Sequence, residues 1–206
     1  MLERVLNINR VLENLPAYRN LRASLPSTPD VLCHNHELRE YFAEGIRLIY
    51  LPYTNYRINT FCFKNIEYDV LSAPFSGCIM ALLYGINEER FFVCHVATPK
   101  CAKVYSNLIS SGNYPCYRQF TPSAAFELDE IINKEYPTAI FGLITKSLDC
   151  YSIAMLSDNN APGTYVVSKV KKYNTETGLF DEFSLGIRSN QPLKFAIALH
   201  AARREY

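Results

Sequence analysis

The chain has 206 residues and a mass of 23.6 kDa, which is the size of one ordinary domain that can bury a core without disulfides or metals. Its 21 Lys and Arg residues against 20 Asp and Glu residues leave a net charge of +1, which excludes a strong general attraction to nucleic acid or to an anionic membrane. With 49% hydrophobic and 20% charged residues, the composition is that of a globular protein and not of a disordered one.

Two helices are predicted in the first 45 residues. Apolar residues near the N-terminus recur at helical spacing: Leu2, Val5, Ile8, Leu12 and Leu15. Pro16 ends this amphipathic helix, and the Pro-rich stretch 16–30 is typical of a connector. A second, short helix is predicted from Asn35 to Ala43, with Gly45 just beyond its end.

From residue 46 onward, short runs of aromatic and aliphatic residues separated by Pro, Gly and Asn predict strands. These runs span residues 47–51, 58–63, 78–84, 90–97, 138–145, 151–156, 164–173 and 179–183. Helices are predicted near Ala102–Ile109 and over Pro122–Lys134, where Thr121 is the expected N-cap. The C-terminal stretch 193–204 fits either a strand or a helix.

We therefore expect an α+β fold: a single domain over residues 1–206, mainly an antiparallel or mixed β-sandwich flanked by helices. Residues 1–45 would be the helical N-terminal part of the same domain, and the chain is expected to be a monomer. No internal repeat, low-complexity tract or long linker divides the sequence.

The cysteines and the N-terminus bear on the compartment in which the protein works. Seven cysteines are an odd number without a C-x-x-C pair, so we expect reduced thiols and neither a disulfide set nor a zinc ribbon. Charges interrupt the apolar stretch at the N-terminus, so a Sec signal is not indicated. The longest apolar run, near Cys78–Ile86, is far shorter than the about 18 residues of a membrane span. These features predict a protein that works in a reducing aqueous compartment and binds neither a membrane nor a nucleic acid.

The most informative pattern is a predicted hairpin that carries a cysteine and a histidine. Cys78 follows Ser76 and Gly77 at the start of one strand, His95 lies on the next strand, and the stretch 84–89 reverses the chain between them. The midpoint of positions 78 and 95 falls inside this reversal, so we expect the two residues directly opposite each other on one face of the sheet. A thiolate nucleophile would then meet an imidazole that returns a proton to the leaving group.

The residues just before Cys78 suit the same chemistry. Gly77 leaves the backbone open to an approaching acyl carbon, and an amide N–H in the loop of Ser76 and Gly77 would hold the oxyanion. A structural role stays open as well, because a buried free cysteine is usually a small apolar residue.

Three features resemble the glutamine deamidase superfamily of cytotoxic necrotizing factor, Burkholderia lethal factor and the chemoreceptor deamidase CheD: Ser76-Gly77-Cys78 in an apolar strand, His95 on the next strand, and Ser72 six residues before the cysteine. The lethal factor is similar in length, and Leu51-Pro52-Tyr53 resembles its L-P-aromatic strand. Ser72 stands where that toxin has a catalytic Thr, and it keeps the hydroxyl group of this third catalytic role. The resemblance covers about residues 46–98.

The resemblance implies catalysis without a metal or any other cofactor. Cys78 would attack the side-chain carboxamide of a glutamine in a host protein, His95 would protonate the departing ammonia, and water would hydrolyse the thioester to glutamate. Known relatives are toxins that act on Rho-type GTPases or on a translation-initiation helicase. The chain would then be a bacterial toxin or effector that is made in the bacterial cytoplasm and acts in the host cytosol.

Other functions remain open at this point. The same dyad suits a thiol peptidase or amidase, or a transglutaminase that uses an amine as acceptor, whereas a non-catalytic protein-binding module needs no dyad. The segment 33–36 contains a His-x-His pair, but no second ligand cluster at a suitable spacing supports a metal site. Tyr50, Tyr53 and Tyr56 are candidates for a wall against which a target protein packs.

Overall fold

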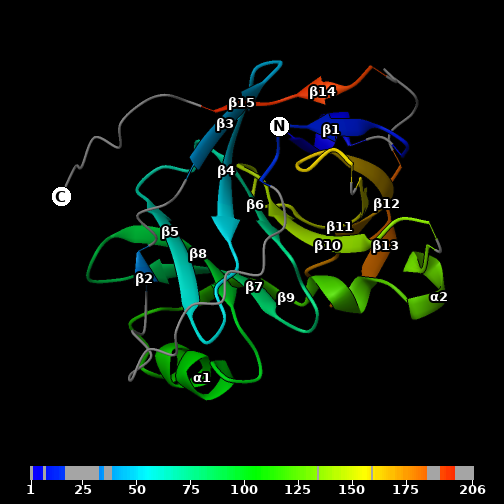
Figure 1. The fold of residues 1–206 in the computed structure, drawn as a ribbon. Helices are drawn as coiled ribbons and strands as arrows, with labels where there is room; N and C mark the ends of the chain where they lie inside the picture. Colours follow the sequence, from blue (N-terminus) through cyan, green and yellow to red (C-terminus); the bar gives the residue numbers. More distant parts are fainter. Residues whose placement is uncertain are drawn as a thin grey trace.

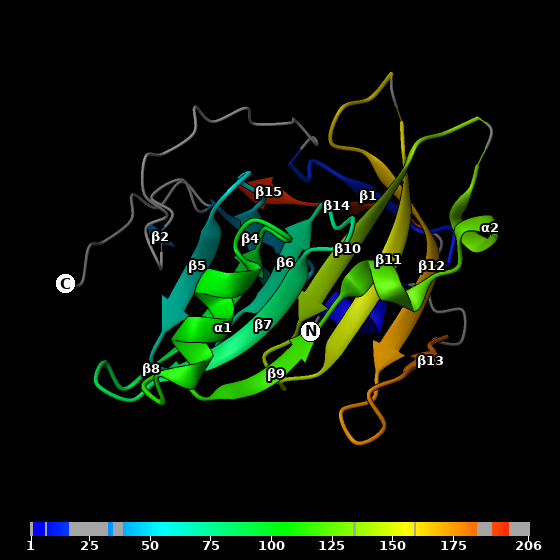
Figure 2. The same ribbon diagram turned by 90° about the horizontal axis from the view of Figure 1, so that it is seen from below.

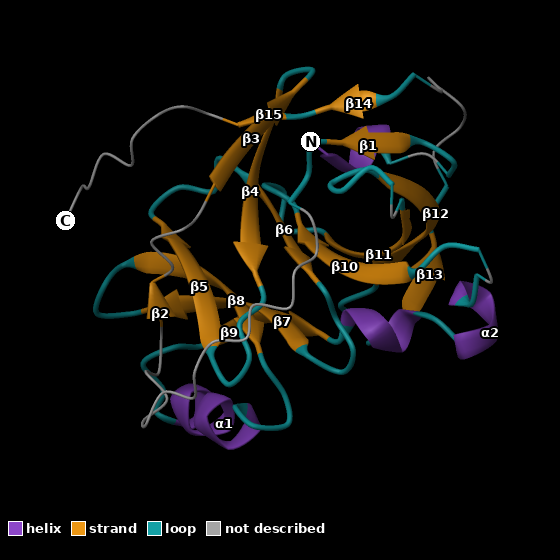
Figure 3. Cartoon of the chain, viewed as in Figure 1, coloured by secondary structure: helices purple, strands orange, loops and turns teal. Residues whose placement is uncertain are grey.

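Strands are the main secondary structure of the described chain (Figures 1 and 3). The computed structural model describes residues 2–6, 8–16, 33–34, 39–133, 135–158, 160–184 and 191–197. The described helices are the α-helices α1 (Ala102–Ser110) and α2 (Leu128–Ile131) and the 3₁₀ helices η1 (Leu2–Val5) and η2 (Pro122–Ala125). The expected α+β sandwich flanked by helices is therefore wrong, because the chain forms two β-sheets with few helices, and one sheet curves into a barrel-like form. No helix in the described part of the chain combines the length and the apolar content that a membrane crossing needs.

The larger sheet has ten strands and curves until it is nearly closed (Figure 1). Neighbouring strands follow the order β14-β1-β12-β11-β10-β6-β4-β3-β15, and β13 pairs with β12. Its strands are β1 (Val11–Glu13), β3 (Arg39–Ala43), β4 (Ile46–Pro52), β6 (Asp69–Ala73), β10 (Thr138–Ile144), β11 (Cys150–Ser157), β12 (Tyr165–Tyr173), β13 (Phe180–Glu182), β14 (Leu193–Lys194) and β15 (Ala196–Ile197). The sheet is mixed, because β4 runs parallel to β6 and β1 runs parallel to β14.

One short C-terminal segment joins the two ends of this strand order. β14 pairs with β1, whereas β15, which follows after the single residue Phe195, pairs with β3. The Phe195 amide donates to the carbonyl of Glu13 at 3.0 Å, and the Phe195 side chain is buried. The segment Leu193–Ile197 therefore bridges the gap between β1 and β3 and protects edges of the sheet that would otherwise be open.

The smaller sheet has five strands in the order β2-β5-β8-β7-β9. Its strands are β2 (Cys33–His34), β5 (Ile58–Phe63), β7 (Ile79–Gly85), β8 (Arg90–Val96) and β9 (Cys116–Phe120). One face of this sheet is covered by α1, whose Tyr105 and Leu108 pack on it (Figure 2). The opposite face packs against the outside of the larger sheet.

Alternation along the strands produces separate apolar cores, because successive side chains point to opposite faces of a sheet. The inside of the curved sheet buries side chains that include Leu2, Leu12, Leu71, Phe141, Ile153 and Phe195. The core between the two sheets, here called the intersheet core, buries side chains that include Leu51, Val70, Phe75, Cys78, Met80, Leu82, Phe120 and Ile140. The intersheet core contains Cys78, and Tyr53 packs against it.

Of the helices predicted over residues 1–45, the structure shows only one 3₁₀ turn, η1, in the described part, and the rest of the prediction is wrong there. η1 ends at Val5, and the chain then passes into β1. Asn9 and Asn14 have φ angles of +67° and +62°, a left-handed conformation that an α-helix cannot contain. Of the apolar residues in the expected stripe, Leu12 is buried inside the barrel-like sheet, but Ile8 is 49% exposed.

The second predicted N-terminal helix is replaced by a hairpin of β3 and β4. Its turn consists of Glu44 and Gly45, with φ angles of +48° and +77°. Two consecutive left-handed residues are characteristic of a tight two-residue hairpin turn, so Gly45 connects two strands and does not end a helix. Residues 35–38 of the predicted helix lie outside the described residues.

The central part of the prediction is confirmed. The eight strands expected from residue 47 to 183, and helix α1, agree with the observed bounds to within one residue. The helix expected over Pro122–Lys134 divides into η2 and α2, because Phe126 and Glu127 have extended backbones; Lys134 lies outside the described residues. Of the ambiguous stretch 193–204, residues 193–194 and 196–197 are strands, and the part after 197 lies outside the described residues. The sequence did not predict β6 and β9, and β6 carries Ser72.

Candidate active site

His95 is a buried residue at the centre of the smaller sheet. It is 1% exposed and lies on β8, directly opposite Met80 on β7 and Asn59 on β5. Its ring stacks on the ring of Phe75, with centroids 4.1 Å apart and planes 6° apart, and the ring of Tyr53 lies 5.2 Å away. These aromatic contacts fix the plane of the imidazole within the intersheet core.

Ser72 and His95 form a hydrogen bond that connects the two sheets. Ser72 is fully buried on β6 of the larger sheet, and its Oγ lies 2.7 Å from His95 Nδ1. The same Oγ lies 2.5 Å from the carbonyl oxygen of Leu51, its direct neighbour on β4. The serine is therefore shared between a histidine and a backbone carbonyl.

The hydrogen count of this pair determines the tautomer of the histidine. A serine hydroxyl has one hydrogen, and the carbonyl of Leu51 can only accept, so the hydroxyl of Ser72 donates to that carbonyl. His95 Nδ1 must then be the donor in the 2.7 Å contact with Ser72 Oγ. In a neutral imidazole whose Nδ1 carries the hydrogen, Nε2 carries a lone pair.

Nε2 of His95 has no hydrogen-bond partner among the described residues, although it is buried. Burial also lowers the pKa of His95 to about 3, because the imidazolium would lose its hydration. The imidazole is therefore neutral at physiological pH, and it presents an unpaired base inside the protein. Buried polar atoms without partners are uncommon, so this nitrogen requires an explanation.

Cys78 lies on the same face of the smaller sheet as His95, but in a different register from the predicted one. The predicted direct pairing is wrong, because Met80 is the residue opposite His95 and Gly85 pairs with Arg90. The register differs from the expected one by two positions, and a shift of two leaves every side chain on its face. Cys78, just before β7, is thus a diagonal neighbour of His95 and packs in the intersheet core with 4% of its surface exposed.

The loop of Ser76 and Gly77 is exposed, and its backbone is already engaged. Gly77 has a φ of +107°, with no heavy atom within 4 Å of the position of a Cβ atom. Its amide donates to Ser123 Oγ at 2.9 Å, and its carbonyl accepts from the Thr98 hydroxyl. The Gly77 N–H, an expected oxyanion donor, is therefore occupied by Ser123.

The alternation of amide directions along β7 suggests the amide of Cys78 as the alternative oxyanion donor. Even-numbered residues of β7 direct their amides towards the β9 side of the strand, as the bond from the Tyr84 amide to the Pro115 carbonyl shows. Cys78 is the residue just before β7, and extending the same alternation to it directs its N–H towards the β9 side. At this point β9 has already ended at Phe120. This end of the sheet also carries the open position at Gly77.

Asn59 is a site residue that the sequence did not single out. It is 2% exposed, and its Nδ2 donates to the Pro52 carbonyl at 2.6 Å and to Thr54 Oγ1 at 2.7 Å. These two bonds hold the segment that carries Tyr53 against the His95 ring. A polar residue at the start of an otherwise apolar predicted strand, Ile58–Phe63, was the available signal.

The other sequence candidates lie elsewhere. Tyr50 is buried inside the curved sheet, where its hydroxyl donates to the Ala73 carbonyl, so of the three expected wall tyrosines Tyr53 is the one against His95. His34 lies on β2, whereas His36 is outside the described residues. Within the described ranges, no group of three His, Cys, Asp or Glu residues is arranged to hold a metal ion. Six cysteines, all except Cys33, are described as free thiols.

Comparisons with protein-family models, with curated proteins and with solved structures find no match for this chain. The chemistry of the site therefore has to be argued from its own residues.

Proposed function

We propose that this chain is a cysteine-dependent glutamine deamidase that converts a glutamine of a protein substrate to glutamate. The observation that carries the proposal is the hydrogen bond between Ser72 and His95, because it leaves the Nε2 lone pair of His95 without a partner. Cys78 lies on the same face of the sheet, one diagonal position away. Nε2 of His95 can accept the proton of the Cys78 thiol.

In the first half of the reaction, His95 Nε2 takes the proton of the Cys78 thiol as the sulfur bonds to the side-chain carbonyl carbon of glutamine. The protonated imidazole then gives this proton to the amide nitrogen, the C–N bond breaks, and ammonia leaves. The product of this half is a thioester between Cys78 and the substrate. Because burial lowers the pKa of His95, the imidazole begins as the neutral base that this sequence of steps requires.

In the second half, water attacks the carbonyl carbon of the thioester while His95 Nε2 takes a proton from the water. The C–S bond breaks, the sulfur of Cys78 regains its proton from the imidazolium, and the product carboxylic acid then gives its own proton to the released ammonia, so that a carboxylate and an ammonium ion remain. In sum, glutamine and water become glutamate and ammonium, and no cofactor takes part. Ser72 keeps the hydrogen of His95 on Nδ1 throughout, and the amide of Cys78 stabilises the oxyanion.

Access to the dyad requires a side chain to move. Cys78 and His95 are 4% and 1% exposed, whereas Gly77 is exposed and has open space beside it. Tyr53 is half-buried over the imidazole, and its hydroxyl donates to Asn55 Oδ1. We place the entrance at Gly77, with Tyr53 turning outward as the carboxamide enters.

The class of substrate is proposed from the resemblance over about residues 46–98. On this basis the chain is a bacterial toxin or effector, and its substrate is a host protein of the Rho-type GTPase or translation-initiation helicase class. Such a protein would be made in the bacterial cytoplasm and would act in the host cytosol.

The decisive experiment compares the wild-type protein with Cys78→Ala in host-cell lysate. Mass spectrometry of the digested lysate should find one glutamine converted to glutamate by the wild-type protein and left unchanged by the variant. Cys62→Ala is the matched control, because Cys62 is a half-buried thiol on the neighbouring strand β5 and packs on the α1 side of the sheet. Conversion by a folded Cys78→Ala protein would refute the proposal.

A second candidate function follows from the burial of both groups. A thiol that is 4% exposed and an imidazole that is 1% exposed also suit a non-catalytic binding module, in which the Ser72–His95 bond connects the sheets. Iodoacetamide distinguishes the two candidates. Selective alkylation of Cys78, prevented by His95→Asn, supports the enzyme, whereas a thiol that reacts no faster in the native protein than the other buried cysteines supports the binding module.

A further inference from the structure

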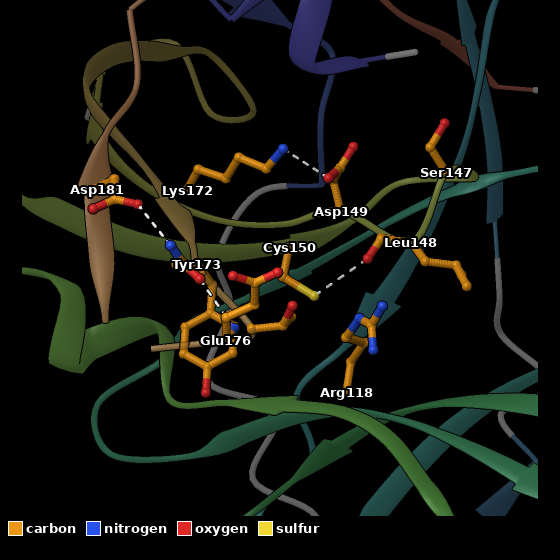
Figure 4. A pocket seen from close by; sticks show the side chains of 11 residues that line it. Arg118, Ser147, Leu148, Asp149, Cys150, Lys172, Tyr173, Glu176 and Asp181 are labelled. Carbon is orange, nitrogen blue, oxygen red and sulfur yellow. Dashed lines mark hydrogen bonds and ion pairs between the residues drawn. The ribbon is translucent and has the colours of Figure 1, made fainter. Parts of the chain in front are cut away.

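A cavity of about 440 Å³ opens between the two sheets at the edge strand β9, away from the dyad (Figure 4). Its lining comes from β9, from the turn that precedes β11, from the end of β12 and from the turn between β12 and β13. Five of the lining residues carry charge: Arg118, Asp149, Lys172, Glu176 and Asp181. A cavity of this volume is in the usual range of small-ligand sites.

Arg118 supplies a cation that forms no ion pair with a carboxylate of the described residues. Its Nη1 donates to the carbonyl of Tyr117 at 2.8 Å, and its Nε is buried and has no partner among the described residues. No ion pair joins Arg118 to any described Asp or Glu. A guanidinium group can bind a carboxylate through two hydrogen bonds, so Arg118 has capacity left for an anionic ligand.

The other wall supplies carboxylates that form no ion pair with the described cations. Glu176 lies in the turn between β12 and β13, and Asp181 lies on β13, where it accepts from Asn174 Nδ2 at 3.4 Å. Neither carboxylate forms an ion pair within the described ranges. Lys172, the second cation of the lining, is already paired with Asp149 at 2.7 Å. In Figure 4, Arg118 and Asp181 lie on opposite sides of the view, with Glu176 between them.

We propose that this cavity binds a compact zwitterion of peptide size, with its carboxylate on Arg118 and its ammonium group between Glu176 and Asp181. One unpaired cation and two unpaired carboxylates line the cavity, so one ligand with both charges satisfies the two kinds of group. A phosphate group fits the same cavity poorly, because it would place about two negative charges near three carboxylates. A short peptide with free termini has the required charges, and three extended residues span roughly 10 Å.

The cavity and the dyad are separate sites. Phe120 lies between them: it pairs with Met80 across β9 and β7, and its ring stacks on that of Tyr173 with centroids 5.6 Å apart. The proposal therefore does not depend on deamidation. Cys78→Ala must retain the ligand affinity of the wild-type protein, so failure of one proposal can be told from failure of the other.

The test uses the full-length protein and triglycine as the probe, with isothermal titration calorimetry and thermal unfolding as readouts. Triglycine should bind, and triglycine amide, which lacks the carboxylate, and N-acetyltriglycine, which lacks the ammonium group, should bind at least about tenfold more weakly. Arg118→Gln should weaken triglycine binding at least about tenfold, and Asp181→Asn should weaken it less. Arg90→Gln is the matched control, because Arg90 begins β8 and does not line the cavity.

Several results would overturn the inference. They are the absence of saturable triglycine binding in the millimolar range, equal affinity of the amide or acetyl derivative, tighter binding of inorganic phosphate, and unchanged affinity in a folded Arg118→Gln protein. If Arg118→Gln fails to fold, Asp181→Asn still tests the proposal. Asp181 is exposed, and the side-chain oxygen of an asparagine at this position can still accept the hydrogen bond from Asn174 Nδ2. A fully retained affinity in Asp181→Asn and in Glu176→Gln would also contradict the zwitterion.

Discussion

The gap between the two sheets holds two polar sites that differ in their exposure to water. Around His95 the gap is closed, and the polar groups there are neutral and few, with the Ser72–His95 bond as the connection between the sheets. At the edge strand β9 the gap opens into the cavity, where Arg118 faces Glu176 and Asp181 without direct pairing. Burial therefore decides the protonation state around His95, whereas hydration permits separated charges in the cavity.

The largest expected effect separates the two sites by activity. In His95→Asn, the side-chain amide can still donate to Ser72, but it cannot act as a base. We expect the deamidation rate to fall about 10²–10⁴-fold, the usual size of a lost general base, while triglycine affinity stays unchanged. Single-turnover kinetics and calorimetry on the same preparation measure both quantities. A rate within threefold of wild type would remove His95 from the mechanism.

The second prediction concerns the tautomer. Ser72→Ala removes the acceptor of the Nδ1 hydrogen and the donor to the Leu51 carbonyl, so both buried partners lose a bond. We expect a loss of about 1–3 kcal/mol in the free energy of unfolding, as for buried groups left unpaired, and a fall in kcat of about ten- to a hundredfold.

Ser72→Thr is the conservative control, because it restores the hydroxyl group. It should recover kcat more than stability, since its extra methyl group must fit into a fully buried position. Urea unfolding and steady-state kinetics check these expectations. Equal kcat values for Ser72→Ala and the wild-type protein would show that Ser72 only connects the sheets.

The third prediction uses pH. The pKa of His95 is lowered to about 3 in the folded protein, while the unfolded chain has an ordinary histidine near 6.5. Below pH 6.5 the unfolded state therefore binds a proton that the folded state does not, and the folded protein loses stability as the pH falls towards 3. The contribution is about 1.4 kcal/mol per pH unit within this window.

His95→Asn should lack this contribution, so its free energy of unfolding should fall less steeply than that of the wild-type protein between pH 6 and pH 4. Urea titrations at several pH values measure the difference. Parallel slopes for the two proteins would show that His95 titrates normally. Arg118→Gln, in the open cavity, should leave the wild-type slope intact.

The smallest effect is expected at the closed end of the gap. Gly142 on β10 pairs with Ser72, and an added Cβ atom would lie 2.6 Å from Met80 Sδ, 2.9 Å from Pro122 and 3.1 Å from Phe75. In Gly142→Ala the flexible end of Met80 can move, so we expect a loss of about 1 kcal/mol in stability. Because Phe75 stacks on His95, activity should also fall severalfold, whereas triglycine binding should not change. Thermal unfolding and the two functional assays test this order of effects.

Part of the candidate site was predictable from sequence, because side chains alternate between the two faces of a strand and this alternation does not depend on the exact register. Cys78 and His95 share a face although the predicted register was two positions wrong, since a shift of an even number preserves the face. The Ser72–His95 contact was suggested by a family resemblance and not by spacing, because β6 was not a predicted strand. Asn59 was missed, since a buried polar residue in a strand gives little local signal before its partners are known.

The sequence by itself determined the elements in which local preference and burial agree: the aromatic and β-branched strands between residues 47 and 183, and helix α1. The described part of the first 45 residues depends on tertiary packing, since leucines at helical spacing there lie inside a barrel-like sheet that Leu193–Ile197 nearly closes. Tertiary packing also brings Ser72 of the larger sheet to His95 of the smaller sheet. It leaves Arg118 without an ion pair to Glu176 or Asp181. The reason is physical: spacing along a chain records which face a side chain occupies, whereas the partner across a core depends on how whole sheets curve and pack.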